Sequence, residues 1–429
     1  MYEQVFKNSL GGSERCILCR GTKLLCGKER CPILARYYSK TRVFSLIDSL
    51  QIEGASPPSV FIGRWGYPKV FVGPMLPPKL GDTSFMDTPE EWIDCSIDQF
   101  IDFRSQLIRG KYRIGVKDVE TEEKIIQQTK EIAFSESPIV MDAEFEKKPR
   151  GRLVLSDTVQ PYGPSAPLSK IEMGNLKWDQ RVEKAHGDTD LKSKDAVFQL
   201  YNSKMLISKI QKAFSVGGFG IKKERRFVPT RWSITAVDSI VGQELVKEIK
   251  EFPEIDEYRV YEWRNLDNLW AVLFLPLEWC YELIEAWYPF TAWNPFGKET
   301  HIYSSHEFWK GRKTYAEIGG CYYAARLAVG ETLKKERRQA GCVIFREVHP
   351  GYILPVGVWN VRENVRKTLT TKPNLFSSLN DALLYISRIM DIPVRRWVKN
   401  STVLKHRIYQ QRIEDFVKSG PNENLRNPL

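Results

Sequence analysis

The amino-acid sequence predicts an α+β protein in which a mixed sheet core is flanked by helices. Segments with strand-like alternation and segments with helical periodicity interleave along its 429 residues. They do not alternate regularly, as the elements of a doubly wound α/β protein would. Hydrophobic residues make up 42% of the chain and charged residues 27%, and no repeat or low-complexity tract interrupts it. This composition is typical of a globular protein.

The chain is basic and has no membrane-spanning signal. Its 64 lysines and arginines against 53 acidic residues give a formal net charge of +11, which favours a polyanionic partner. No apolar run approaches the ~20 residues of a membrane span. The first residues also lack the apolar core of a signal peptide. We therefore expect a cytoplasmic protein without a membrane partner.

The N-terminal segment, 1–50, is expected to be a small zinc-binding module. It holds four of the eight cysteines, namely Cys16, Cys19, Cys26 and Cys31. The first two are spaced as in a zinc knuckle, where two thiolates from one tight turn reach the same ion. Four thiolates fill a tetrahedron, so the predicted zinc is structural and not catalytic. The alternative is four unrelated thiols.

Residues 51–400 form the predicted α+β core, which begins with a hairpin over 57–74. Two apolar runs flank a Gly/Pro turn there, and Arg64 with three glycines indicates close approach of the backbone to a ligand such as phosphate. A plain hairpin is the alternative.

A capping-box signal at Thr88 starts the next element. We expect helices over 88–109, 119–134, 195–214, 276–288, 318–338, 358–369 and 378–390, and strands over 138–145, 258–265, 269–275 and 341–349.

A long loop over 146–193 interrupts the core. Its 155–167 portion carries too many apolar and aromatic residues for a linker, so we expect an ordered functional loop that contains Asp157.

Five arginines are candidates for binding phosphate. Arg226 and Arg231 lie in a basic run over 222–232 that also holds Phe and Trp, and this mixture suits nucleic acid, because arginine pairs with phosphate while aromatic rings stack on bases. A solvated basic loop is the alternative. Arg362 and Arg366 are four residues apart on one helix face, and Arg64 lies in the hairpin.

Candidate catalytic residues are histidines and isolated carboxylates. His301 and His306 are expected on a turn or loop, and His349 at the end of a strand. Asp142, which shares a strand face with Glu144, and Asp157 are the carboxylates. Such groups hold a divalent metal such as Mg²⁺ or Mn²⁺ and activate water. We expect the loop around Asp157, the basic run and the histidine pair to converge on one phosphate-binding pocket; the alternative spreads them over separate surfaces.

The C-terminal tail, 401–429, carries a short cluster of apolar residues, and its composition is typical of a flexible end. Gln410, Ile413, Phe416 and Val417 stand at i, i+3, i+6 and i+7, so one helical turn gathers the apolar three on a single face. This pattern resembles the PCNA-interacting peptide of proteins that bind the sliding clamp, with Val417 where the strongest examples have a second aromatic. The alternative is an ordinary amphipathic last helix.

Several stretches together resemble the archaeal Nre DNA-repair proteins. They are the cysteine cluster, 61–68, 156–165, 226–232, 357–366 and the clamp-binding tail. The resemblance implies a nucleoid-associated role in DNA repair with the PCNA sliding clamp, and with DNA or nucleotide as ligand. Two function classes fit: a metal-dependent nuclease or nucleotide phosphohydrolase, which loops rich in Gly, Pro, Trp and His favour, or a non-catalytic zinc-containing adaptor that binds DNA.

Replacing Phe416 with alanine is expected to abolish clamp binding and leave the fold intact. Loss of an aromatic anchor at an interface costs ~2 kcal/mol or more, which is about thirty-fold in affinity. Calorimetric titration of the clamp with both proteins measures this difference. Equal affinities would mean that the tail is an ordinary terminal helix.

Overall fold

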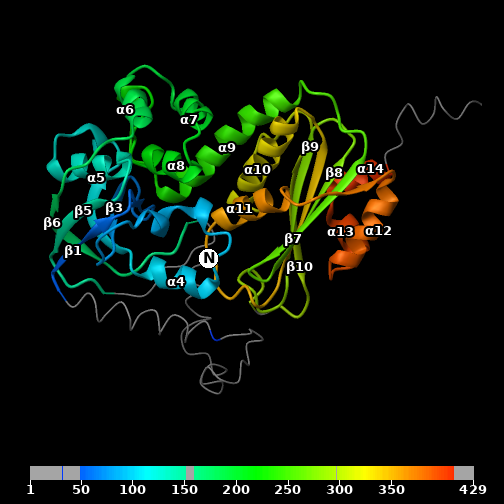
Figure 1. Ribbon diagram of the computed structural model, residues 1–429, viewed down its shortest axis with the longest axis horizontal. Coiled ribbons are helices and arrows are strands. Elements are labelled where there is room, and N and C mark those ends of the chain that lie inside the picture. Colours follow the sequence, from blue (N-terminus) through cyan, green and yellow to red (C-terminus); the bar gives the residue numbers. More distant parts are fainter. Residues whose placement is uncertain (1–30, 32–48, 151–158, 296, 410–429) are drawn as a thin grey trace, which may run out of the picture.

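Two mixed six-stranded sheets lie at opposite ends of the molecule, and helices α8 to α11 lie between them (Figure 1). The computed structural model describes residues 31, 49–150, 159–295 and 297–409. Both sheets with their helices make an α+β fold, as the sequence predicts. Among the described residues, no helix is long and apolar enough to cross a membrane.

The first sheet has the strand order β1-β5-β6-β4-β3-β2, with all pairs antiparallel except β4 and β6. Its strands are β1 (Gln51–Ser56), β2 (Val60–Ile62), β3 (Lys69–Leu76), β4 (Ile108–Gly115), β5 (Ile139–Phe145) and β6 (Ser165–Met173). The expected hairpin is confirmed, because β2 pairs with β3 in the register Ile62 to Val72.

One face of the first sheet is covered by helix α5 (Lys124–Phe134). Val70, Val72 and Ile114 point to this face and share a buried cluster with Ile126 and Phe134 of α5.

Side chains alternate between the two faces of a strand. The intervening residues of β3 and β4 therefore point to the other face of the first sheet. That face is covered near Met75, which packs in a buried cluster with Leu107 and Phe103, and among the described residues it is open where Lys69, Phe71 and Arg113 are exposed.

The second sheet is covered on both faces. Its order is β10-β9-β11-β8-β7-β12. Val272 and Phe274 pack in the cluster that contains α9 and α10, whereas Leu273 packs with Ile386 and Trp397 from the helices on the opposite side. Burial on both faces explains the continuous apolar sequence of the central strand. The strands are β7 (Tyr258–Asn265), β8 (Asn268–Leu275), β9 (Cys280–Trp287), β10 (His301–Glu307), β11 (Gly341–Val348) and β12 (Asn374–Phe376).

The helices fall into two groups. Most of them lie around and between the sheets, and the last three cover the outer face of the second sheet (Figure 1). Besides α5, they are α4 (Ile97–Ser105), α6 (Gln180–Gly187), α7 (Ser193–Asn202), α8 (Ile207–Ser215), α9 (Thr230–Ile249), α10 (Gly320–Glu336), α11 (Trp359–Thr368), α12 (Leu379–Ile389), α13 (Val394–Asn400) and α14 (Thr402–Tyr409).

Two predicted helices have different boundaries in the structure. The helix expected from Thr88 begins only after Ser96, because the Thr88 hydroxyl donates to the carbonyl of Ser84 (2.8 Å) while Ser96 forms the capping box with Gln99. The helix expected over 195–214 is two helices, α7 and α8, because Lys204 between them adopts a left-handed φ of 61°.

The Trp-rich helix predicted over 276–288 is wrong, because most of this segment forms strand β9. Both faces of β9 are buried, which hides the alternation of a half-exposed strand. Its two buried glutamates have partners: Glu285 pairs with Arg346 (2.7 Å), and Glu282 accepts from the backbone amides of Thr402 (2.8 Å) and Val403 at the start of α14. The long helix α9 was not predicted.

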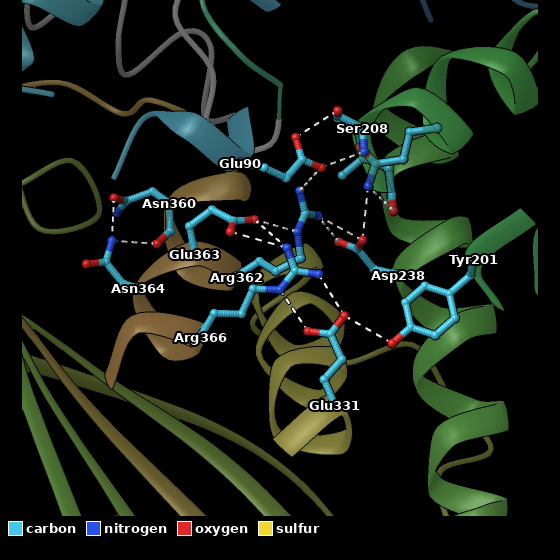
Figure 2. A network of polar contacts seen from close by, with 12 residues as sticks. Glu90, Tyr201, Ser208, Asp238, Glu331, Asn360, Arg362, Glu363, Asn364 and Arg366 are labelled. Carbon is cyan, nitrogen blue, oxygen red and sulfur yellow. Dashed lines mark hydrogen bonds and ion pairs between the residues drawn. The ribbon is translucent and has the colours of Figure 1, made fainter. Parts of the chain in front are cut away.

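A buried network of ion pairs connects the central helices (Figure 2). Arg362 of α11 binds Asp238 of α9 at 2.9 Å and Glu363 at 3.0 Å. Arg366, one turn later, pairs with Glu331 of α10 at 2.7 Å and also with Glu363. Burial raises the pKa of Asp238 to about 6 against the pull of Arg362. Asp238 is therefore ionised at neutral pH and depends on that arginine.

The network reaches the first half of the chain through Glu90. This residue follows Pro89 in the short 3-10 turn Pro89–Glu91, and its carboxylate accepts from the amide (2.9 Å) and the hydroxyl (2.8 Å) of Ser208 in α8. Its Oε1 also lies 4.0 Å from Nη2 of Arg362. One set of charges therefore holds four separate segments together.

We expect Arg362→Ala to destabilise the protein strongly. Removing one partner of a buried ion pair leaves the other charge uncompensated, which costs about 3–5 kcal/mol. Urea unfolding measures the loss. Lys170→Ala is the control, because it breaks the exposed pair between Lys170 and Glu172, and such pairs contribute about 0–1 kcal/mol. Similar losses in the two variants would contradict the assigned role of the network.

Candidate nucleic-acid interface

Stretches that are far apart in the sequence meet at one corner of the first sheet. The ring of Phe61 packs on Tyr162, with centroids 4.6 Å apart, and the amide of Ile62 donates to the hydroxyl of Thr230 at 2.9 Å. Phe61 also packs against a buried cluster that contains Val159 and Val358. The hairpin, the 159–165 part of the long loop, the basic run and the start of α11 therefore share one junction.

Aromatic rings are exposed beside this junction. Tyr67 from the hairpin lies against Trp232 from the first turn of α9, with ring centroids 5.2 Å apart. Trp65, at the hairpin tip, is 64% exposed, and the guanidinium of Arg64 lies 4.7 Å from its ring centroid. Large apolar rings that are solvent-exposed and grouped together mark a binding surface more often than rings scattered singly.

The open face of the first sheet continues the same surface. Lys69 and Phe71 of β3 and Lys111 and Arg113 of β4 point outward, with Phe71 and Arg113 directly opposite each other in the register. The ammonium of Lys111 lies 5.5 Å from the ring centroid of Phe71. Cations therefore stand beside exposed rings here, as they do at the hairpin tip.

The basic run is joined to this sheet by backbone hydrogen bonds. The amide of Phe227 donates to the carbonyl of Val116 at 2.8 Å, and the amide of Val116 donates to Pro68 at 2.9 Å. Arg226 therefore lies next to the ends of β3 and β4. We call the combined surface the basic-aromatic face; it comprises Arg64, Trp65, Tyr67, Lys69, Phe71, Lys111, Arg113, Arg226, Arg231 and Trp232.

The cations of this face are largely uncompensated. Arg64, Lys69, Lys111, Arg113 and Arg226 form no ion pair with any carboxylate in the described part of the chain. Burial, together with the nearby charge of Arg109, lowers the pKa of Lys111. A bound anion would relieve this repulsion. The face therefore has the electrostatics of a phosphate-binding surface.

The other half of the open face is acidic. Glu53, Asp142 and Glu172 lie directly opposite one another on β1, β5 and β6. Asp142, a predicted catalytic residue, also accepts from the side-chain amide of Gln51. Lys170 offsets the charge of Glu172, but Glu53 and Asp142 repel phosphate, so this half of the sheet is less favourable for an anionic ligand than the half that carries the cations of the basic-aromatic face.

Arg362 and Arg366 do not bind phosphate as expected. Both lie in α11, four residues apart, but their guanidinium groups are held by Asp238, Glu331 and Glu363 inside the ion network (Figure 2). Helical spacing alone could not reveal Asp238 and Glu331, which lie on the neighbouring helices α9 and α10. The two arginines hold the fold together and leave phosphate binding to other residues.

The structure does not bring His301 and His306 together. Both lie in the edge strand β10 and not in a turn, and their odd separation places them on opposite faces. His306 packs near Phe308, whose ring contacts His406 of α14. The expected convergence of the two histidines on one pocket is therefore wrong.

His349 lies in a cluster with two carboxylates. Its Nε2 is 3.2 Å from Glu347 and 3.7 Å from Asp391, and the three ligand atoms lie within 4.8 Å of one another. A histidine and two carboxylates suit a divalent cation. Glu347, however, already accepts the amides of Asp391 and Ile392, so the cluster also fits an imidazolium that ties β11 to the turn after α12.

Some predicted site residues fall outside the described residues. Cys31 is described and partly buried, but its companions in the expected zinc site are not. The remaining positions outside the described ranges are Cys16, Cys19, Cys26, Asp157, Gln410, Ile413, Phe416 and Val417.

The sequence prediction missed the part of the face that lies on the sheet. Lys69 and Phe71 alternate in the hairpin, and Lys111 and Arg113 alternate in β4. The predicted helix over 88–109 concealed the start of β4, so this second alternation went unnoticed. The cations two residues apart in the second run were the available signal.

Comparisons with family models and with individual proteins agree with each other. A family model described as archaeal Nre, N-terminal, matches residues 25–294, and one described as archaeal Nre, C-terminal, matches residues 307–416. The chain is 39% identical to DNA repair protein NreB of Archaeoglobus fulgidus over 391 residues, which covers 91% of this chain and 97% of that protein. It is 39% identical to NreA of the same organism, covering 88% and 94% of the two chains. It is 31% identical to NreA of Haloferax volcanii, covering 82% and 86%. No solved structure matches the chain.

The stability of the protein is expected to fall as pH rises through the pKa of His349. Burial lowers this pKa, but Glu347, with Asp267 and Asp391, outweighs burial and raises it above the usual 6.5. The stabilisation is therefore complete below the unfolded-state pKa and is lost as pH rises through the folded-state pKa. Urea unfolding in EDTA between about pH 5 and pH 8 measures it, and His349→Gln should remove it. A stability difference between the two proteins that does not change with pH would contradict this assignment.

Proposed function

Because this chain belongs to the archaeal Nre family, we propose that it acts in DNA repair by binding DNA through the basic-aromatic face. Its relatives are named DNA repair proteins, and family membership supports that general role. The uncompensated cations on the open sheet face are the observation that carries the binding role. DNA is the polyanion that a repair protein meets, and most contacts to it are made to phosphate.

The geometry favours binding of DNA along an extended strip of the surface rather than binding of a phosphate in a closed pocket. Arg64, Lys69, Arg113 and Arg226 reach the surface from four segments and lie among exposed rings. Cations spread in this way follow a backbone of repeated phosphates. A single nucleotide would use only part of such a surface.

We further propose that the tail recruits the protein to the PCNA sliding clamp and that the cysteine cluster binds structural zinc. The motifs described above support both proposals: Gln410, Ile413, Phe416 and Val417 for the clamp, and Cys16, Cys19, Cys26 and Cys31 for zinc. A protein held on the clamp needs only moderate intrinsic affinity for DNA, because tethering raises its effective concentration.

A second candidate function is a metal-dependent nuclease or nucleotide phosphohydrolase. The cluster of Glu347, His349 and Asp391 favours it, because it offers three ligands of the kind that Mg²⁺ or Mn²⁺ accepts. This activity stays a prediction. DNA binding is common to the enzyme and to the non-catalytic adaptor, and it is therefore the function proposed here.

Replacing Lys69 and Arg113 together with alanine is expected to weaken DNA binding and flatten its salt dependence. Each lost phosphate contact lowers the slope of log affinity against log salt by about 1, so the double variant should lose about 2. Fluorescence anisotropy with a labelled oligonucleotide over a series of salt concentrations measures both quantities.

The matched control removes the same two charges at the other end of the molecule. Lys399 of α13 and Arg388 of α12 are exposed, and these helices lie beyond the second sheet (Figure 1). The Lys399→Ala, Arg388→Ala variant should keep the wild-type slope. Equal slopes in both double variants would reject the basic-aromatic face as the DNA-binding surface.

A further inference from the structure

We infer that the basic-aromatic face binds single-stranded DNA, with unpaired bases stacked on its exposed rings. This inference rests on the proposed function and specifies the form of the DNA. Four rings of the face are solvent-exposed: Trp65 by 64%, Tyr67 by 46%, Trp232 by 45% and Phe71 by 41%. In a duplex the base faces are covered by their neighbours, so such rings would have little to bind. Unpaired bases offer free faces.

The rings are held in place by the surrounding structure, so they are prepared for binding. Tyr67 and Trp232 support each other across two segments. The hydrogen bond from the amide of Ile62 to Thr230 and the bonds that connect Phe227, Val116 and Pro68 hold these two segments together. A ring that is already ordered loses little entropy when a base stacks on it.

Two of the exposed rings, Trp65 and Phe71, have cations close enough to serve the same nucleotide. Arg64 lies 4.7 Å from the ring centroid of Trp65, and Lys111 lies 5.5 Å from that of Phe71. Arg113 is directly opposite Phe71 in the strand register. Stacking and phosphate pairing can therefore occur side by side, and this combination characterises single-strand binding surfaces.

The distribution of charge on the sheet also favours one strand over two. The sheet cations of the basic-aromatic face occupy the adjacent strands β3 and β4, which are about 4.8 Å apart, whereas the exposed Lys170 of β6 is paired with Glu172. The acidic row of Glu53, Asp142 and Glu172 lies on the far side of the same open face. A narrow cationic strip bordered by carboxylates suits a single phosphate backbone, whereas the major groove of a duplex is already ~12 Å wide between its two backbones.

The test compares a fluorescently labelled 20-nucleotide oligo-dT with a labelled blunt duplex of the same length. Wild-type protein should bind the single strand at least about tenfold more tightly, since each stacked base contributes ~1–3 kcal/mol. The Trp65→Ala, Trp232→Ala variant should lose about tenfold or more of its single-strand affinity. Its duplex affinity and salt slope should stay unchanged, because all the arginines and lysines of the face remain.

Two controls keep the outcome clear. Trp309→Ala removes a partly exposed tryptophan that lies against Lys250, just after the last residue of α9, and it should leave binding unchanged. The melting temperature of each variant checks folding, and quenching of tryptophan fluorescence by oligo-dT reports stacking directly in the wild-type protein.

The outcomes separate the two proposals. Equal or tighter binding of the duplex, or full single-strand affinity in the double-tryptophan variant, would overturn the inference. If the Lys69→Ala, Arg113→Ala variant still flattened the salt dependence in that case, the proposed DNA-binding function would stand. If neither double variant changed binding to either probe, both proposals would fall.

Discussion

The buried ion pairs between α9, α10 and α11 are the interaction on which the arrangement of this molecule depends. Asp238 has no exposure to solvent, and its charge is tolerable only because Arg362 lies 2.9 Å away. Removing a charge of this kind from water is costly, so the pairing fixes the positions of the helices more strictly than apolar contacts would. The start of α9, which carries Trp232, is thereby placed against the hairpin of the first sheet.

The sequence correctly predicted the elements that are determined by local residues and depend little on tertiary contacts. The strands predicted over 258–265 and 269–275 form the hairpin of β7 and β8, and Leu266 and Asp267 between them have the positive φ values that its tight turn requires. The long helix α10 was predicted almost to its ends. Arg64 and Arg231 were predicted as phosphate ligands, and the structure places both on the basic-aromatic face.

The sequence predictions failed where tertiary contacts decide the outcome. Helix α9 is covered by α7, α8 and α10, so its apolar residues do not form one stripe that a helical period would detect. Glu363 lies three residues before Arg366 in α11, but Asp238 and Glu331 come from α9 and α10, and no spacing in the sequence relates these two carboxylates to the arginines. Burial on both faces removed the alternation that would have identified β9.

The division of the family into two models does not coincide with a structural boundary. The N-terminal match ends at residue 294 and the C-terminal match begins at 307. The second sheet crosses this division, because β8 and β9 lie on one side of it and their common neighbour β11 on the other. Neither part can complete this sheet alone, so the two parts are expected to fold and to be inherited together.

The anchoring of α14 determines where the C-terminal tail leaves the folded protein. Val403 and Leu404 are buried under the second sheet, and the amides at the start of the helix are bound by Glu282 of β9. The motif proposed for the clamp begins at Gln410, directly after Tyr409, the last residue that the structure describes. The described part of the chain therefore ends beyond the second sheet, on the opposite side of the molecule from the first sheet, which carries most of the basic-aromatic face (Figure 1).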